Sequence, residues 1–302
     1  MGRLGCSARR RLGRLGLPLA VGLAAAAFVA PAGAAGAVHR YVALGDSYTA
    51  GPLIPNPTGE PIDCGRSTNN YPHLVARAIH PAVFRDVSCG SATTKDMTKP
   101  QTGLPLGGTN PPQFDALGRW IDLVTVGIGG NDMGFGGIVT TCAQLGLQSG
   151  GAGHPCTDHY TSGGVNRVYR RLHDVVGPRL RRTFRGIERR APHARLLVVG
   201  YPDPVPQSPG CYPIVPLAAG DLPFLHGVAR RLDRVERRHA KAAGARYVEL
   251  VPGSIGHDIC QPPGTKWYEG IFPTSPAYPA HPNALGEAYA ARRVLAVLGA
   301  SG

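Results

Sequence analysis

The chain has 302 residues, a formal net charge of +13 and a hydrophobic content of 43%. This length suits one large domain, or at most two, with enough apolar residues for a sizeable core. Past the N-terminal segment no stretch is long and apolar enough to cross a bilayer, which argues against a polytopic membrane protein.

Residues 1–37 have the features of a secretory signal peptide. A basic start is followed by an Ala-rich apolar run from Leu15 to Ala30 and by small-x-small cleavage sites. The run is shorter than the roughly 20 residues that a membrane anchor needs. We therefore expect secretion, by the general or the twin-arginine route, and a mature domain of residues 38–302. Five of the arginines lie in this segment, so the charge of the remainder is +8.

The mature sequence alternates between short apolar runs and helical patterns. Five runs are expected to form strands: Tyr41–Leu44, Phe84–Val87, Leu123–Ile128, Leu196–Val199 and Tyr247–Val251. Their continuous apolar character is typical of parallel strands buried on both faces. Pro- and Gly-rich segments, expected to be long surface loops, are Pro52–Pro61, Pro100–Pro112 and Gly146–Pro155. The alternation predicts an α/β sandwich with a parallel sheet.

Apolar positions spaced by three and four residues mark three helices. One spans Val165 to Ile187 and should kink or split at Gly177-Pro178. A second runs from Leu225 to Ala242, and a third, capped by Asn283, ends near Leu298.

Positive charge gathers in two of the helical segments, Arg167–Arg195 and Arg230–Arg246. Such a surface can meet nucleic acid or anionic lipid, but a solvated face is the more economical interpretation. No nucleic-acid motif accompanies the charge, so no nucleic-acid partner is expected.

Six cysteines remain after the signal segment: Cys64, Cys89, Cys142, Cys156, Cys211 and Cys260. An even number in an exported chain predicts disulfides and leaves their pairing open. The sequence contains neither CxxC nor HExxH, so no metal site and no cofactor are expected.

Two short motifs far apart in the chain have complementary chemistry. Gly45-Asp46-Ser47-Tyr48 follows the first predicted strand, and His281-Pro282-Asn283 precedes the last helix. A serine hydroxyl becomes a nucleophile when histidine takes its proton and donors stabilise the oxyanion. Residue 49 is Thr, so the motif is not the G-x-S-x-G elbow of the α/β-hydrolase fold.

Two further segments follow predicted strands and offer hydrogen-bond donors. Gly127–Asp132 contains Asn131, whose amide is a candidate donor, and it lacks the G-x-G-x-x-G spacing of a nucleotide site. Ser88–Thr93 offers the backbone N–H of Gly90 or Ser91.

Taken in order, these blocks resemble those of the SGNH (GDSL-type) hydrolases, and most of all the secreted actinobacterial lipases and esterases with three disulfides. The four blocks are Ser47 in GDSY, Cys89-Gly90-Ser91-Ala92, Asn131 in GGND and His281 in HPN. The resemblance covers nearly the whole mature chain, from about Val38 to Leu298.

The resemblance implies a flavodoxin-like three-layer α/β/α sandwich with a five-stranded sheet. It also implies that Ser47 is the nucleophile and His281 the general base. The oxyanion hole would comprise the Ser47 N–H, the N–H of Gly90 or Ser91, and the Asn131 side chain. Asp46 and Asp132 would support their loops. The sequential cysteine pairing of the family implies Cys64–Cys89, Cys142–Cys156 and Cys211–Cys260.

The sequence departs from the family pattern near the histidine. Many members have Asp three residues earlier, where this chain has Tyr278. We therefore expect a Ser–His dyad, with the imidazole oriented by the carbonyl of Tyr278 or Pro279. Asp258 and Glu269 are the alternative third members.

The substrate class is less closely defined by the sequence. Apolar residues near the motifs are candidates for an acyl pocket: Met133, Phe135, Ile138, Trp267, Tyr268, Ile271, Phe272 and Tyr278. The segment Trp267–Phe272 is the favoured wall because it closely precedes His281. We expect a monomeric ester hydrolase acting on small-molecule or lipid esters, with transient contact at a lipid interface left open. The alternatives are a deacetylase of carbohydrate or other small-acyl esters, a phospholipase and, last, a non-catalytic surface-binding protein.

Overall fold

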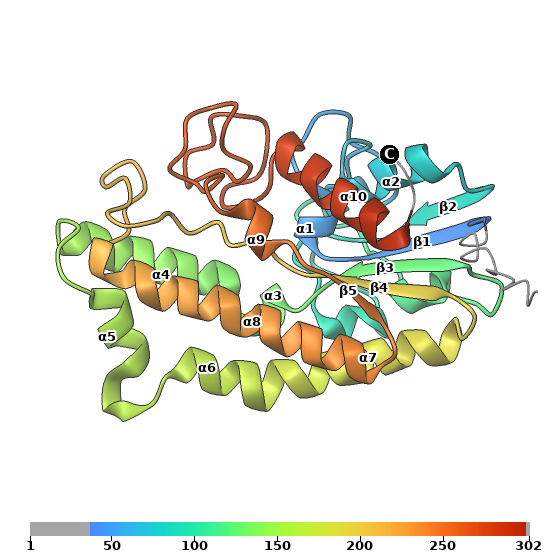
Figure 1. The fold of residues 1–302 in the computed structure, drawn as a ribbon, viewed down its shortest axis with the longest axis horizontal. Coiled ribbons are helices and arrows are strands. Elements are labelled where there is room, and N and C mark those ends of the chain that lie inside the picture. Colours follow the sequence, from blue (N-terminus) through green and yellow to red (C-terminus); the bar gives the residue numbers. More distant parts are fainter. Residues whose placement is uncertain (1–36, 300–302) are drawn as a thin grey trace, which may run out of the picture. The chain divides into compact units, whose positions relative to one another are not determined.

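Five parallel strands form the centre of the fold (Figure 1). In a computed structural model, which describes residues 37–299, they are β1 (Arg40–Gly45), β2 (Val83–Asp86), β3 (Leu123–Gly127), β4 (Arg195–Val199) and β5 (Arg246–Val248). Residues 1–36, nearly all of the predicted signal peptide, lie outside the described residues.

The strands follow the order β2-β1-β3-β4-β5, so the chain reverses its direction of progress across the sheet between β1 and β3. At such a point the loops after two adjacent strands diverge and leave a crevice at the carboxyl edge, which is where ligands bind in this class of fold. The structure confirms the predicted α/β class, the flavodoxin-like order and all five parallel strands.

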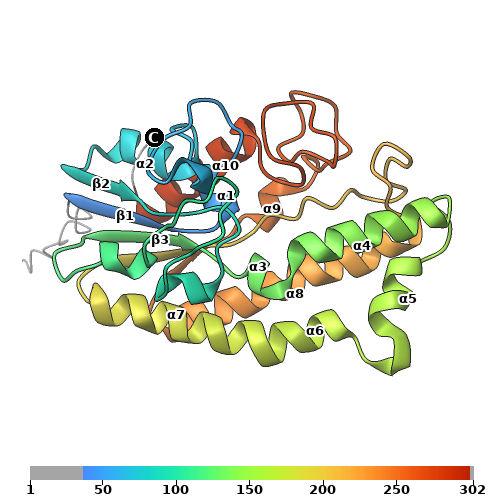
Figure 2. The same ribbon diagram turned by 180° about the vertical axis from the view of Figure 1, so that it is seen from behind.

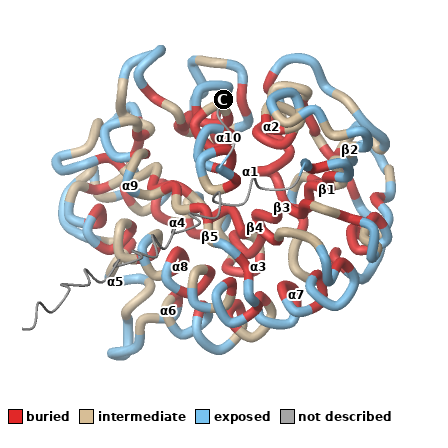
Figure 3. The backbone as a smooth tube through the Cα atoms, turned by 45° about the vertical axis from the view of Figure 1, so that its right-hand side comes forward, coloured by how far each residue is buried: buried red, intermediate tan, exposed pale blue. Residues whose placement is uncertain are grey.

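Side chains along β1 explain why helices cover both faces of the sheet. Val42 and Leu44 pack into one core, whereas Tyr41 and Ala43 pack into the other. Successive residues of a strand point to opposite faces, so an unbroken apolar strand needs a cover on each side. Figure 3 shows the resulting burial along the strands and the inner sides of the helices.

Helices form the two outer layers. The eight-residue and longer helices are α2 (Tyr71–Ile79), α4 (Phe135–Gln148), α7 (Gly177–Arg190), α8 (Leu222–Ala242) and α10 (Ala284–Leu298). The shorter ones are α1 (Ser47–Ala50), α3 (Gly130–Met133), α5 (Pro155–Thr161), α6 (Arg167–Arg171) and α9 (Val251–Ser254). Helices α2 and α10 pack together on one face, and α7 and α8 pack together on the other (Figures 1 and 2).

The interruption expected at Gly177-Pro178 takes the form of a π-helical turn, Leu172–Val176, between α6 and α7. Pro178 has no N–H to donate to Asp174, and the Gly177 N–H instead reaches the carbonyl of Leu172. The dihedrals of the residues that flank this turn are helical, so α6 and α7 follow one another without an intervening loop. Gly177 also faces His239 of α8, where a Cβ would lie 3.0 Å from the ring.

Several expected boundaries differ from the observed ones by one to three residues. The loop predicted over Gly146–Pro155 begins later, because Gly146 belongs to α4, which ends at Gln148. The strand predicted to reach Val251 ends at Val248. Pro252 accounts for that, since its fixed φ suits the first turn of a helix, here α9. Asn283 caps α10 as expected, accepting the N–H groups of Leu285 and Gly286.

Three disulfides connect the cysteines in the sequential pairing that the resemblance implies. Cys64–Cys89 joins a 3-10 turn, Ile62–Cys64, to the segment after β2. Cys142–Cys156 joins α4 to α5, and Cys211–Cys260 joins two long loops. None of the helices that the structure describes is long and apolar enough to cross a membrane.

A buried carboxyl group fastens α10 to α2. Glu287 is 1% exposed, and its Oε2 accepts the Tyr71 N–H at 2.7 Å, whereas its Oε1 has no partner. Burial raises the pKa of Glu287 well above its usual value. The protonated carboxyl therefore stabilises the fold in full below the unfolded-state pKa near 4.5. That contribution is lost as the pH rises through the folded-state value.

We predict that Glu287→Gln reduces the loss of stability at alkaline pH, because the amide keeps an acceptor for Tyr71 and carries no charge. Urea unfolding should show a stability change that is more favourable at pH 8 than at pH 4 by about 1.4 kcal/mol or more. Glu188→Gln, on the exposed side of α7, serves as the control. An equal change at the two pH values would contradict the prediction.

Candidate active site at the carboxyl edge of the sheet

Ser47 lies at the point where β1 turns into α1. The Asp46 carboxylate caps α1 by accepting the Tyr48 N–H, so Ser47 is the first helical residue. The turn requires Gly45, whose φ is +154°. A Cβ at Gly45 would lie 2.7 Å from the Gly127 carbonyl and closer still to Thr49. The backbone around β1 and β3 therefore admits no side chain at this position.

Ser47 and His281 form a direct hydrogen bond. The Ser47 Oγ and His281 Nε2 are 2.7 Å apart, although the residues are separated by 234 positions. His281 Nδ1 lies 2.8 Å from the Pro279 carbonyl. A carbonyl only accepts, so Nδ1 carries the proton and the lone pair of Nε2 faces the serine hydroxyl.

Of the two carbonyls expected to orient the imidazole, Pro279 is the one in contact. The Tyr278 carbonyl instead accepts the backbone N–H of His281 at 3.1 Å. No carboxylate among the described residues bonds to His281. Asp258 accepts from its own loop, at the Cys260 N–H and Gln261, and Glu269 bonds Lys266, Asn283 and Thr274. Neither alternative third member is therefore in position.

Hydrogen bonds from other segments hold the histidine turn against α1. The Tyr48 hydroxyl donates to the Ala280 carbonyl at 2.6 Å. The Tyr278 N–H donates to the Pro52 carbonyl, and the Ala280 N–H to the Gly270 carbonyl. Ala280 has φ +59°, a left-handed conformation that costs a non-glycine residue about 1 kcal/mol. These bonds oppose that strain and fix the direction of the imidazole.

His281 is partly buried, and it lines the wall of the cleft that contains Ser47. Burial lowers the pKa of His281 below its usual 6.5, and the hydrogen bond to Pro279 opposes this only in part. The neutral imidazole, the form that accepts a proton from serine, therefore dominates at neutral pH.

The residues expected to form the oxyanion hole lie in the cleft beside the serine. Ser47, as the first residue of α1, has no intrahelical acceptor for its N–H. Asn131 lies on α3, directly after β3, and one hydrogen of its Nδ2 donates to the Ala92 carbonyl at 2.9 Å, which leaves the second for the cleft. The sequence did not decide whether the backbone N–H of Gly90 or that of Ser91 is the third donor. The Gly90 N–H donates to the Cys64 carbonyl at 2.8 Å, so Gly90 is excluded as a donor and Ser91 remains.

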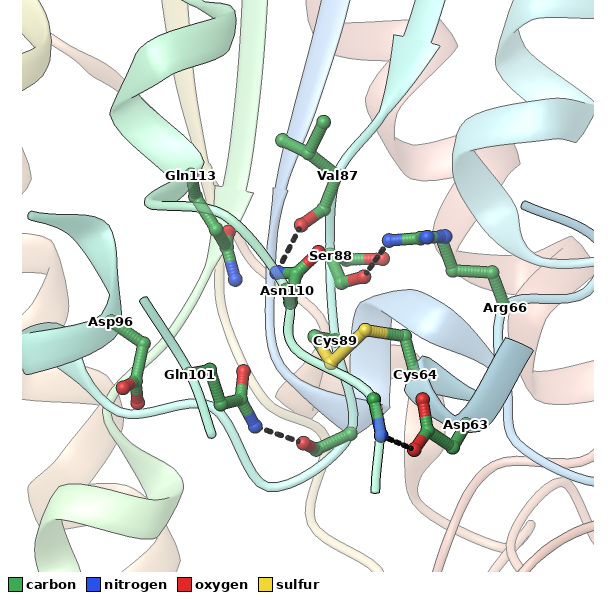
Figure 4. Close-up of a disulfide and its surroundings, with 12 residues drawn as sticks. Asp63, Cys64, Arg66, Val87, Ser88, Cys89, Asp96, Gln101, Asn110 and Gln113 are labelled. Carbon is green, nitrogen blue, oxygen red and sulfur yellow. Dashed lines mark hydrogen bonds between the residues drawn. A yellow bond between two sulfur atoms is a disulfide. The ribbon is translucent and has the colours of Figure 1, made fainter. Parts of the chain in front are cut away.

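The disulfide Cys64–Cys89 anchors this donor loop (Figure 4). Around it, Arg66 donates to the Ser88 carbonyl at 2.8 Å, and Gln101 donates to the Gly90 carbonyl at 2.7 Å. Gly90, Ser91 and Gln101 all line the cleft, and Ser91 takes the left-handed φ of +61°.

Tyr201, which sequence reasoning missed, links the serine loop to the Asn131 loop. It lies two residues past β4, and its hydroxyl donates to Asp46 Oδ2 while accepting the Gly130 N–H at 3.0 Å. Burial raises the pKa of Asp46 to about 7, and the hydrogen bonds from Tyr201 and Tyr48 oppose that shift. The position of Tyr201 after a strand was a signal for the carboxyl edge, but nothing in the sequence indicates where its hydroxyl reaches.

Asp132 supports the neighbouring loop, as expected. Its carboxylate accepts the Thr94 N–H at 2.8 Å and the Thr94 hydroxyl at 2.6 Å, and it pairs with Arg179 of α7 at 3.0 Å. Asp46 and Asp132 therefore both act on loop geometry and lie outside the Ser47–His281 bond.

Two cavities lie side by side near the serine. A cleft of about 670 Å³ contains Ser47, His281 and Asn131. A second cavity of about 100 Å³ lies between α4 and α8 and is almost wholly apolar. Tyr48, Phe135 and Tyr201 line both, so the two cavities share a wall.

The residues predicted to form the acyl pocket do not all line the same cavity. Met133, Phe135, Ile138 and Ile271 line the apolar cavity, and Tyr278 lines the cleft. Of the favoured segment, Gly270 and Ile271 line the apolar cavity, whereas Trp267 stacks on Tyr289, Tyr268 is core and Phe272 is 75% exposed. No cluster of metal-ligating side chains occurs within residues 37–299.

A parallel sheet with a serine–histidine pair at its carboxyl edge is the architecture of an ester hydrolase. The chain belongs to the GDSL-like lipase/acylhydrolase family, whose model matches residues 43–289, and the resemblance seen in the sequence is confirmed. Among proteins, it is similar to Lipase 2 of Streptomyces coelicolor, with 42% identity over 93% of each chain. An esterase of Streptomyces scabiei is 30% identical over 78% of this chain and 77% of its own.

Two solved structures share the fold and have at least 25% sequence identity with this chain. Phospholipase A1 of Streptomyces albidoflavus has a TM-score of 0.70 and 29% identity, covering 86% of this chain and 99% of its own. An extracellular lipase of Streptomyces rimosus has a TM-score of 0.69 and 25% identity, covering 87% and 99%.

We predict that kcat/KM rises with pH along a single acid limb whose midpoint lies below 6.5, because His281 must be neutral to accept a proton. A p-nitrophenyl ester assayed from pH 4 to 9 measures the profile. Asp46→Asn, which removes the neighbouring titrating carboxyl, should keep this limb. A limb near pH 7 that disappears in Asp46→Asn would assign the profile to Asp46 and contradict the prediction.

Proposed function

We propose that the protein is a secreted carboxylic-ester hydrolase that acts through an acyl-serine intermediate. The proposal rests on one observation above all, the 2.7 Å contact between Ser47 Oγ and His281 Nε2 inside a cleft. Membership of a lipase/acylhydrolase family supplies the reaction class.

In the first step Ser47 Oγ attacks the ester carbonyl carbon while His281 Nε2 takes its proton. The carbonyl oxygen becomes an oxyanion, facing the N–H groups of Ser47 and Ser91 and the Asn131 amide. Collapse of this intermediate breaks the ester C–O bond, and His281 gives its proton to the departing alcohol. Water then attacks the acyl-serine with His281 again as base, which releases the carboxylic acid and restores Ser47.

Within this reaction the Pro279 carbonyl orients the imidazole and no carboxylate takes part. When His281 is protonated, the Nδ1–H still donates to Pro279, so the ring does not turn between the two proton transfers. One chain supplies both members of the dyad, and we expect a monomer to be sufficient.

The apolar cavity is the proposed site of the acyl chain. Its wall of Met133, Ile138 and Leu225 offers no partner to a polar group, and it adjoins the serine across Tyr48 and Phe135. Each methylene that leaves water for such a cavity contributes about 0.8 kcal/mol, which favours an acyl group longer than acetyl. The deacetylase alternative has no comparable support.

Secretion is supported by the predicted signal peptide and by the three disulfides, since disulfides persist in oxidising compartments. The similarity to an extracellular lipase of Streptomyces rimosus agrees with this interpretation.

The nucleophile is tested with a fluorophosphonate probe, which labels an activated serine. We expect wild type to be labelled, and Ser47→Ala to lose the label together with on the order of 10⁴-fold or more in kcat. Ser91→Ala is the matched control, because it removes the other serine of the cleft and keeps its backbone N–H. Equal labelling of Ser47→Ala and wild type would exclude the mechanism.

Chain-length selectivity tests the acyl site. Ala229 of α8 lines the apolar cavity, and Ala229→Leu should fill part of it. We expect kcat/KM on p-nitrophenyl acetate to change less than about twofold, and kcat/KM on the decanoate to fall about tenfold, or 1.4 kcal/mol. Ala296→Leu, on the exposed side of α10, controls for added volume. Parallel losses on both esters would place the acyl chain elsewhere.

A further inference from the structure

A second groove, of about 480 Å³, opens beside the cleft, between the 3-10 turn Thr94–Met97 and helix α7. Five cationic side chains line it: Lys95, Arg179, Arg182, Arg189 and Arg190. Threonine hydroxyls from both walls join them, at positions 93, 94, 98 and 183. No carboxylate is among the lining residues that the structure describes. The charged side chains that line the groove are therefore all cationic.

Only part of this charge is balanced by the protein. Arg179 pairs with Asp132, and Arg190 lies over the ring of Phe114 and donates to the Gly186 carbonyl. Lys95, Arg182 and Arg189 are exposed and make no ion pair within residues 37–299. Like charges held near one groove repel one another, and a bound anion relieves that repulsion.

The basic groove is continuous with the cleft of Ser47. Thr93 and Lys95 line both, and Lys95 is the one lysine or arginine among the described residues that lines the cleft. The junction is well fixed, because Asp132 bonds both Thr94 in one wall of the groove and Arg179 in the other. Asp132 directly follows Asn131, so the groove begins beside the proposed oxyanion site.

We propose that this basic groove binds the phosphate group of a glycerophospholipid whose acyl ester lies at Ser47. The proposal rests on the proposed function and narrows its substrate class. A phospholipid has its phosphate and its acyl esters on one glycerol unit, which requires an anion site adjoining an ester cleft and an apolar cavity. Guanidinium groups suit phosphate because they donate two parallel hydrogen bonds. Nucleic acid is the less suitable anion, because the groove offers no open aromatic face, Phe114 being covered by Arg190.

The chain provides a matched set of control residues. Arg181 and Arg185 are exposed on α7 near His239 and do not line the groove. Replacing them removes the same total charge from the same region of the molecule. The groove variant is Arg182→Gln/Arg189→Gln, which leaves Lys95 in the wall of the cleft, and the control variant is Arg181→Gln/Arg185→Gln.

The test compares two esters of one acyl length, both as monomers in solution. They are dihexanoyl phosphatidylcholine below its critical micelle concentration and p-nitrophenyl hexanoate. We expect the groove variant to raise KM for the phospholipid at least tenfold and to change kcat/KM for the p-nitrophenyl ester less than twofold. The control variant should leave both unchanged. No loss in the groove variant, or the same loss in the control variant, would overturn the proposal.

A binding measurement separates this proposal from the catalytic one. Calorimetry with Ser47→Ala measures binding of dihexanoyl phosphatidylcholine without turnover, and binding should be lost when the groove substitutions are added. If this binding is present while wild type hydrolyses neither ester, the catalytic proposal fails alone.

Inorganic phosphate should compete with the phospholipid in wild type and leave p-nitrophenyl hexanoate turnover unchanged. Competition by a single-stranded oligonucleotide at lower concentration than phosphate would assign the groove to nucleic acid and overturn the proposal.

Discussion

The hydrogen bond between Ser47 and His281 is the constraint on which the rest of the structure depends. It joins residues 234 positions apart, and its 2.7 Å length requires that a loop before α10 return to the end of β1. The sheet order provides the space for this loop by opening a crevice between β1 and β3. Hydrogen bonds of the histidine turn with Tyr48, Pro52 and Gly270 hold the loop there. The long loops carry these contacts, and disulfides limit the freedom of two of them at Cys64–Cys89 and Cys211–Cys260.

Hydrogen bonds connect the loop that carries Ser47 to the loop that carries Asn131. The Tyr201 hydroxyl bonds Asp46 on one side and the Gly130 N–H on the other, so the residues before Ser47 and before Asn131 share a partner. Asp132 continues the connection to Thr94 and to Arg179 of α7. A displacement of either loop therefore breaks buried hydrogen bonds in the other, at a cost of about 1–3 kcal/mol for each group left unsatisfied.

The sequence was sufficient for features that depend on local pattern. Apolar runs located all five strands, and Asn283 identified the start of α10. It was insufficient where the answer depended on a backbone hydrogen bond formed in the folded chain. The N–H of Gly90 is occupied by the Cys64 carbonyl, and the imidazole meets Pro279 because Tyr278 already serves the His281 N–H. Closeness to His281 along the chain was also a poor guide to the pocket wall, since Trp267 and Phe272 precede His281 yet lie outside the apolar cavity. Tyr201 could not be identified for a related reason, because its hydroxyl bonds two loops that are distant from it in the sequence.

The main-chain carbonyl of Pro279 gives the histidine an orienting group unlike an aspartate. It has no proton to gain in the acid range, so acidification does not withdraw the acceptor from Nδ1. It also carries no formal charge, which leaves the imidazolium without a counter-ion and agrees with the lowered pKa of His281. A carbonyl oxygen belongs to every amino acid. No amino-acid substitution removes this acceptor, and a substitution can disturb it only by moving the backbone. The proposed orienting group of the histidine is thus insensitive to amino-acid substitution in a way that a side chain is not.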